Sequence, residues 1–162
     1  MSVSILAGYL PGCIGRVTAL HASYYQPLVG FGLAFECKVA RELADVCEYY
    51  DDRRDGLWLA RTPDGIQGSI AIDGSRADAE GAHLRWFIAS DRVRGQGVGT
   101  ALIAAAMAFC DERAYRRVYL WTFDGLQAAR ALYERAGFEL VHQQRGSQWS
   151  TEVEEQRFER CR

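Results

Sequence analysis

The sequence predicts a mixed α/β fold with a mostly antiparallel, twisted central sheet flanked by helices. Two segments, 56–61 and 66–73, carry strand-like residues on either side of "TPDG", whose proline and closing glycine suit a tight turn between antiparallel strands. Other segments repeat apolar residues at helical spacing, and they alternate with further strand-like runs. A chain of 162 residues fits a single domain, which we expect to span residues 1–162.

The first elements are predicted as follows. The stretch "GCIGRVTALHASYY" (12–25) is interpreted as a first strand, followed by a loop around Pro27 and Gly30. Between residues 31 and 50 the apolar side chains recur every three or four positions on an otherwise charged segment, which predicts a helix. The hairpin 56–61/66–73 follows. An acidic stretch "GSRADAEG" (74–81), expected to be flexible, then leads into a strand at 82–90.

The second half alternates helices and strands. A helix follows the glycines near residue 97 and runs to about Arg113. The run "RRVYLWTF" (116–123) is apolar on both faces, which predicts a central strand covered on both sides. Asp124 and Gln127 resemble a capping box for a helix that Gly137 ends. Segments 138–144 and 150–160 are predicted to form a last hairpin.

Composition excludes several classes of protein. The net charge of −2 gives no broad basic field, so we expect no nucleic-acid partner. The longest apolar run, 98–110, is too short to span a bilayer, and no leader pattern is seen at the N-terminus, so we expect a cytoplasmic protein with no membrane partner. The five cysteines and three histidines show no zinc-binding spacing, so we expect no metal.

The stretch "VRGQGVGTALIAAAMAFC" (93–110) places three glycines before a strongly helical segment. A helix start offers unpaired N–H groups and the positive end of a dipole, and glycine lets a ligand approach the backbone, so the pattern indicates phosphate binding. The spacing is not the G-x-G-x-x-G of dinucleotide-binding folds, because position 100 is Thr. No Gly-Lys-Ser/Thr of a P-loop occurs either.

The remaining pattern, Arg94-x-x-Gly97-x-Gly99 with "ALYERAGF" some thirty-five residues later, resembles the GNAT superfamily of N-acetyltransferases. The resemblance covers nearly the whole chain. "AHLRWFIA" and "EQRFER" are similar to a subgroup often fused to MarR-type regulators, although this chain shows no winged-helix portion. The resemblance implies an acyl-CoA N-acyltransferase fold and acetyl-CoA as cosubstrate.

Residue by residue, the resemblance assigns two parts of a coenzyme site. The glycine-rich loop is implied to cradle the pyrophosphate with its N–H groups, and the strand at 82–90 is implied to pair its backbone with the pantetheine. Ala129, on the later helix, is assigned to the same site. The implied cofactor-binding residues are Phe87, Ile88, Ala89, Arg94, Gly95, Gln96, Gly97, Val98, Gly99, Thr100 and Ala129.

The resemblance also implies catalytic residues. Tyr133 matches the family tyrosine, an acid for the departing thiolate, since a thiol pKa near ~8.5 and a phenol pKa near ~10 allow proton transfer. His83 and Glu80 are candidates for a base or water relay. Glu36 on the first helix and Arg85 are candidates for acceptor binding, Arg85 toward an acidic group.

One position departs from the family pattern. Leu126 stands where the family commonly has an asparagine that contacts the coenzyme, which puts that polar contact in doubt.

The sequence therefore predicts an acetyl-CoA-dependent N-acetyltransferase whose amine acceptor attacks the thioester directly in a ternary complex. None of the cysteines has a neighbouring histidine that would indicate a covalent intermediate. A small amine, an amino-acid derivative and a protein or peptide amine all stay open as acceptors, and a homodimer is compatible with the apolar tail. The alternative is a non-catalytic acyl-CoA-binding module that senses or scaffolds a partner. A nucleotide-dependent oxidoreductase is disfavoured.

Overall fold

A computed structural model describes residues 2–162 of the chain. Seven strands form one sheet in the order β1-β2-β3-β4-β5-β7-β6. Neighbouring strands are antiparallel except β4 and β5, which pair in parallel. The strands are β1 (Ser4–Ala7), β2 (Gly56–Thr62), β3 (Gly65–Asp73), β4 (Ala82–Ala89), β5 (Arg117–Phe123), β6 (Glu139–Gly146) and β7 (Val153–Cys161).

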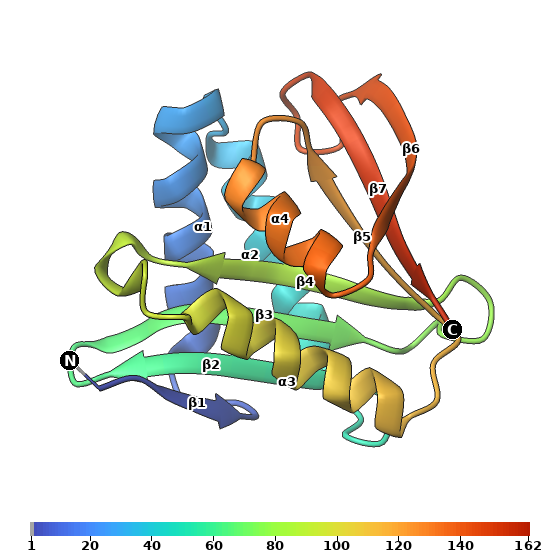
Figure 1. Cartoon of the computed structure of the whole chain (residues 1–162). Coiled ribbons are helices and arrows are strands. Elements are labelled where there is room, and N and C mark those ends of the chain that lie inside the picture. The colour runs from blue at the N-terminus through green and yellow to red at the C-terminus, as the bar shows by residue number, and fades with distance from the viewer. Residues whose placement is uncertain (1) are drawn as a thin grey trace.

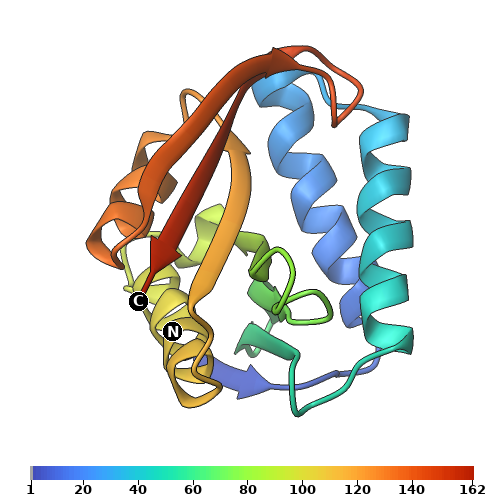
Figure 2. The same ribbon diagram turned by 90° about the vertical axis from the view of Figure 1, so that its right-hand side faces the viewer.

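Helices cover both faces of this sheet. Figure 1 shows α3 and α4 in front of the sheet, and Figure 2, turned by 90°, shows α1 and α2 on the opposite side. A short 3-10 helix, Asp91–Val93, precedes the glycine-rich loop. The helices are α1 (Cys13–Val29), α2 (Leu33–Glu48), α3 (Val98–Glu112) and α4 (Gln127–Arg135). The predicted mixed, mostly antiparallel α/β fold is confirmed.

Most predicted elements lie where the sequence pattern placed them. The hairpin around "TPDG" is β2 and β3, with Thr62 facing Gly65, and the last hairpin is β6 and β7. The strand with two apolar faces is β5, which lies between β4 and β7. Its Val118 and Leu120 pack into the core below α3 and α4, whereas Phe123 packs into the core below α1 and α2. A strand inside the sheet with a core on each side needs apolar residues on both faces.

The predicted first strand at 12–25 is wrong, because this segment is the helix α1. Its buried residues Cys13, Val17, Leu20 and His21 recur at helical spacing and face the sheet. Pro27 lies in the last turn, where it removes one backbone donor shortly before Gly30 ends the helix at a φ of +78°. The first strand is instead the short edge strand β1, which the sequence analysis did not assign.

The predicted capping box of α4 is also wrong. The N-cap residue is Leu126, and no side chain caps the helix. The Asp124 N–H donates to the Glu154 carbonyl at 2.9 Å, so Asp124 continues the pairing of β5 with β7 instead of beginning the helix. The predicted glycine at the end of α4 is confirmed: Gly137 has a φ of +97° directly after the last turn.

Within the described residues, no helix combines the length and the apolar character that crossing a bilayer requires.

Candidate active site

The glycine-rich loop leads into α3 with its backbone amides unpaired. Gly95 and Gly97 both have a φ of +75°, a conformation that favours glycine, and a Cβ atom at either position would meet nothing within 4 Å. Gly97 is the N-cap of α3, and no side chain caps the helix. The first helical hydrogen bond runs from the Ala101 N–H to the Gly97 carbonyl. The preceding amides are therefore available to an anion, with the helix dipole in support.

Gly99 has a different reason to be glycine. A Cβ at this position would lie 2.9 Å from Leu132 Cδ1 and 3.3 Å from the Phe87 ring. Gly99 therefore lets α4 and β4 pack closely on the start of α3. Of the three glycines, two serve the loop conformation and one serves helix packing.

The loop borders a cavity of about 420 Å³ between β4, α3, α4 and α1, which we call the coenzyme groove. Leu126 and, from α1, Tyr24 and Tyr25 also line it. Gln96 is absent from its lining, and the Gln96 amide nitrogen donates to the Arg92 carbonyl at 3.4 Å. The predicted coenzyme residues in the lining are Phe87, Ile88, Ala89, Arg94, Gly95, Gly97, Val98, Gly99, Thr100 and Ala129.

Arg94 is the charged side chain of the groove. Its guanidinium forms an ion pair with Asp91 and lies over the Tyr24 ring, 5.3 Å from the ring centre. About half of the Arg94 side chain is exposed, so Arg94 is held at the mouth of the groove by a residue of the preceding turn and by α1.

Strands β4 and β5 separate at the centre of the sheet. They pair only at Ala82 with Val118 and His83 with Tyr119, and Figure 1 shows β5 rising away from β4 beyond this point. From Leu84 to Ala89, the described structure gives β4 no strand partner on the β5 side. Its backbone amides and carbonyls on that side are free for a ligand.

A bulge in β4 aims the side chains at this opening. The register with β3 shifts between Ser69 and Ala71, and Trp86 has a φ of +50°, which is uncommon for a bulky residue. The buried Ser69 hydroxyl donates to the Trp86 carbonyl at 2.6 Å and holds this conformation. Arg85 and Trp86 consequently stack on one another, 4.2 Å from guanidinium to ring centre, while Phe87 packs toward α3 and Tyr133.

The opening leads into a second cavity of about 210 Å³, which we call the acceptor cavity. Tyr25 and Phe87 line both cavities, so the two meet at these side chains. Part of the acceptor cavity is walled by aromatic rings that contact one another, with centroids 4.8–6.2 Å apart: Tyr25, Phe31, Phe35, Phe123 and Trp149. The lining also includes polar and charged side chains.

Tyr133 lines the acceptor cavity from α4. Its ring packs against Phe87, Phe138 and Phe158 at centroid distances of 5.8–6.1 Å, and 6% of the residue is exposed. Burial raises the pKa of the Tyr133 phenol well above its ordinary value, with a smaller contribution from Tyr25. Tyr133 therefore keeps its proton at neutral pH and is a hydrogen-bond donor at this site.

The two candidates for a base are separated by the fold. His83 lines the acceptor cavity, stacked on Tyr119 with ring centres 4.4 Å apart. Burial, and then the nearby positive charges of Arg85 and Arg157, lower the pKa of His83 well below its ordinary value, so its imidazole is neutral. Glu80 instead lies in the exposed turn before β4, forms an ion pair with Arg76 at 3.1 Å and lines neither cavity.

The two candidates for acceptor binding are separated in the same way. Arg85 lines the acceptor cavity, whereas Glu36 is exposed in the first turn of α2 and lines neither cavity. Glu42, about two turns later in α2, lines the acceptor cavity instead, together with Lys38. Glu42 forms ion pairs with both Lys38 and Arg85. Burial alone would raise the pKa of Glu42, but the hydrogen bonds from Lys38 and Arg85 outweigh it and lower that pKa.

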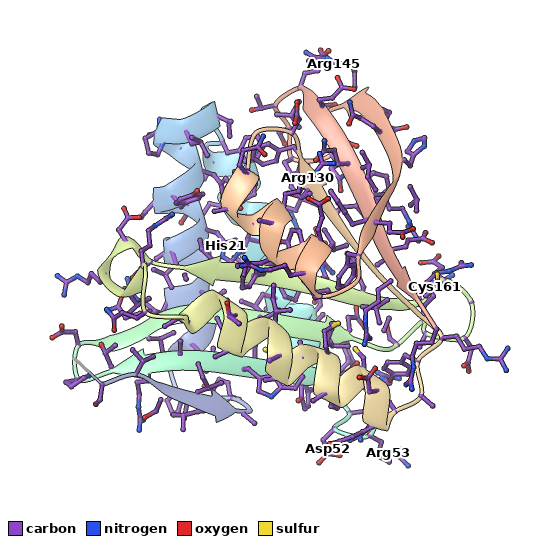
Figure 3. All side chains as sticks on the ribbon, in the orientation of Figure 1. His21, Asp52, Arg53, Arg130, Arg145 and Cys161 are labelled. Atoms are coloured by element: carbon purple, nitrogen blue, oxygen red, sulfur yellow. The ribbon has the colours of Figure 1, made fainter. Side chains whose placement is uncertain are left out.

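Sequence reasoning missed the contribution of α1. His21 lines the acceptor cavity, and burial lowers its pKa to about 4 while its Nδ1 bonds to the Val17 carbonyl at 2.8 Å. Figure 3 labels His21 in the middle of the molecule, in contrast to Arg145 at the outer end of the β6–β7 hairpin. Interpreting 12–25 as a strand concealed both His21 and Tyr25; the helical spacing of the apolar residues was the signal that could have found them.

Among residues 2–162, no group of three or more His, Cys, Asp or Glu side chains is placed to hold a metal ion.

Comparison with known proteins gives consistent results. The acetyltransferase (GNAT) family matches residues 19–138. The chain is 28% identical to the N-acetylaspartate synthetase of Homo sapiens over 127 residues, which is 78% of this chain and 42% of that protein. It is 27% identical to N-acetyltransferase 8B of Rattus norvegicus over 106 residues, 63% of this chain and 48% of that protein. The chain thus spans less than half the length of these relatives.

Solved structures share the whole fold. A GNAT-family acetyltransferase from Staphylococcus aureus superposes with a TM-score of 0.77 at 18% identity, covering 99% of both chains. Arabidopsis thaliana NAA60, in complex with a bisubstrate analogue, superposes with a TM-score of 0.70 at 15% identity, covering 98% of both chains. At these identities the similarity concerns the fold.

Proposed function

The chain belongs to the acetyltransferase (GNAT) family, and from that premise we propose that it transfers the acetyl group of acetyl-CoA to a primary amine in a ternary complex. The observation that carries this proposal is the meeting of two cavities at Tyr25 and Phe87, where β4 and β5 separate. One cavity begins at an anion-binding helix start, and the other is small and holds polar groups. Two substrates bound there are adjacent.

The residues present suit acetyl-CoA. The free amides of the loop and of the first turn of α3 would hold the pyrophosphate, as glycine-rich helix starts do. The unpaired edge of β4 offers amides and carbonyls to the pantetheine. Leu126 adds an apolar contact where the family commonly has a polar one. Acetyl-CoA supplies the activated acetyl group as a thioester.

The protein's contribution to the chemistry is positioning and hydrogen bonding. Free β4 amides beside the opening would stabilise the negative charge that develops on the carbonyl oxygen when the amine attacks. Tyr133, protonated at neutral pH, would donate a hydrogen bond to the departing thiolate, since its raised pKa disfavours full transfer of the proton expected from an ordinary phenol. Neutral His83 would accept a proton from the incoming ammonium, and its low pKa makes it a relay to water rather than a place where the proton stays.

Thermal unfolding of the protein with acetyl-CoA, NADH or ATP tests the coenzyme assignment. A ligand at a hundred times its Kd adds about 2.7 kcal/mol of stability, a readily measured increase in Tm. We expect acetyl-CoA to raise the Tm, and NADH and ATP not to do so. If acetyl-CoA causes no increase, the proposed function is wrong. Release of free CoA thiol in the presence of a panel of amines then tests the transfer itself.

A further inference from the structure

The lining of the acceptor cavity includes three charged side chains, Lys38 and Glu42 from α2 and Arg85 from β4. We propose that the acceptor is a small amine that carries a carboxylate, of the size of an amino acid, and that Arg85, assisted by Lys38, binds this carboxylate. The inference rests on the proposed function and specifies its second substrate.

The charge of the cavity favours an anion. Among the described residues that line it, the charged side chains are Lys38, Glu42 and Arg85, two positive and one negative. The two histidines of the lining, His21 and His83, are neutral because burial lowers the pKa of each. Glu42 is already engaged by both cations. A second positive group on the acceptor would meet a net positive charge and no free carboxylate, whereas an acceptor carboxylate would be attracted.

Arg85 is held in a position to bind. Its guanidinium stacks on Trp86, and its Nη2 donates to Glu42. Within the described residues, its remaining N–H groups have no protein acceptor. Only 19% of the side chain is exposed. Arginine presents five donors in a planar fork that matches a carboxylate. A preorganised and largely desolvated arginine with a free edge is suited to this ligand.

The dimensions agree with an amino acid. The cavity of about 210 Å³ equals the liquid volume of about seven water molecules. On β4, Arg85 and Phe87 lie on either side of the bulged residue Trp86, and both line the cavity. An acceptor whose carboxylate is bound by Arg85 would present its amine toward Phe87, where the two cavities meet. The aromatic wall of Phe31, Phe35 and Trp149 then receives an apolar side chain.

Matched pairs of amines that differ only in the carboxylate test the proposal. We would titrate phenylalanine against phenethylamine, and leucine against 3-methylbutylamine, into protein saturated with CoA, following tryptophan fluorescence from Trp86, Trp121 and Trp149. A charge-assisted hydrogen bond predicts about ten- to a hundredfold tighter binding of the carboxylated member. Arg85→Gln should remove this difference. Arg76→Gln, which changes an exposed arginine outside the cavity, should retain it.

Several results would overturn the inference. They are equal or tighter binding of the amine that lacks the carboxylate, an undiminished preference in Arg85→Gln, and no saturable binding of any amine up to about 10 mM, tenfold above the usual range of KM. If Arg85→Gln leaves Glu42 unbalanced and fails to fold, the double variant Arg85→Gln/Glu42→Gln removes the pair together and takes its place. The thermal test with acetyl-CoA does not involve the acceptor, so failure of the proposed function is seen separately.

Discussion

The coenzyme groove and the acceptor cavity meet at two side chains but are built in different ways. The groove takes most of its lining from one continuous stretch, Phe87 to Thr100, and presents backbone amides. The acceptor cavity takes its lining from α1, α2, β4, β5, α4 and the β6–β7 connection, and presents side chains. A site made of backbone depends on local conformation, whereas a site made of side chains depends on how distant elements pack.

The two regions also differ in electrostatics. Among the described lining residues of the groove, Arg94 is the charged one, and it lies at the mouth. The acceptor cavity has three charged groups and two buried histidines whose pKa values are lowered. Mutations and changes of pH should therefore affect the two regions separately.

The largest effect on activity is expected from Tyr133, which lines the acceptor cavity and packs against Phe87 at the junction of the two cavities. Tyr133→Phe should lower kcat by about 10²- to 10³-fold, the range for loss of one hydrogen-bond donor to a developing negative charge. The Kd for acetyl-CoA should change less than about twofold, since the ring and its packing are kept. Thiol release and calorimetric titration measure the two quantities. Wild-type turnover in this variant would reduce Tyr133 to a core residue, and absence of turnover in the wild type would favour the non-catalytic coenzyme-binding module.

Acid should lower the free energy of unfolding, because His21, a buried residue of the acceptor cavity, resists protonation in the folded protein. The pKa of His21 is about 4 in the folded protein against 6.5 when unfolded. Between these values the unfolded chain binds more protons, so the free energy of unfolding falls as the pH drops from about 7 to 4. The loss approaches about 3 kcal/mol, at 1.36 kcal/mol per tenfold change in proton affinity.

Urea denaturation at a series of pH values measures this loss. His21→Gln should make the dependence shallower without abolishing it, because glutamine does not titrate whereas His83, whose pKa is also lowered, remains. His142→Gln, which changes an exposed histidine of β6, serves as the control and should leave the dependence as in the wild type. Identical slopes for His21→Gln and the wild type would show that another group is responsible.

Backbone strain at a single position of the glycine-rich loop should weaken coenzyme binding in the groove. Gly97→Val forces a β-branched residue to a φ of +75°, a strain of about 1–3 kcal/mol, and should weaken acetyl-CoA binding by about tenfold or more. Gly15→Val is the control, because Gly15 lies inside the helix α1 and an added Cβ would meet nothing within 4 Å. The affinity of amino acids for the acceptor cavity should stay unchanged in both variants. Loss of both affinities in Gly97→Val would show that the two regions are coupled.

The smallest effect concerns the bulge that separates the two regions. Ser69→Ala leaves the buried Trp86 carbonyl without its 2.6 Å hydrogen bond, which should cost about 1–2 kcal/mol of unfolding free energy. The acceptor KM should rise, because Arg85 and Trp86 share this bulge, while the Kd for acetyl-CoA changes little. Ser75→Ala, at an exposed turn, should leave all three quantities as in the wild type. A change in the coenzyme Kd alone would contradict this account.

The sequence by itself determined the parts that depend on local physics. The turn "TPDG" between two strand-like segments predicts a hairpin because its residues adopt the turn with little strain. Glycines before an apolar helix predict an anion site because the conformation and free amides follow from that stretch alone. The predicted residues of the groove therefore line one cavity, with Gln96 as the exception.

Tertiary structure decided the acceptor cavity. Glu36 and Glu42 are both glutamates of one amphipathic helix, and only the packing of α2 against β4 brings Glu42 rather than Glu36 to Arg85. The apolar residues of segment 12–25 already have helical spacing, but their burial against the sheet as α1 depends on how the elements pack. Such choices depend on burial against residues far away in the chain, and burial energy is settled only when the elements pack together.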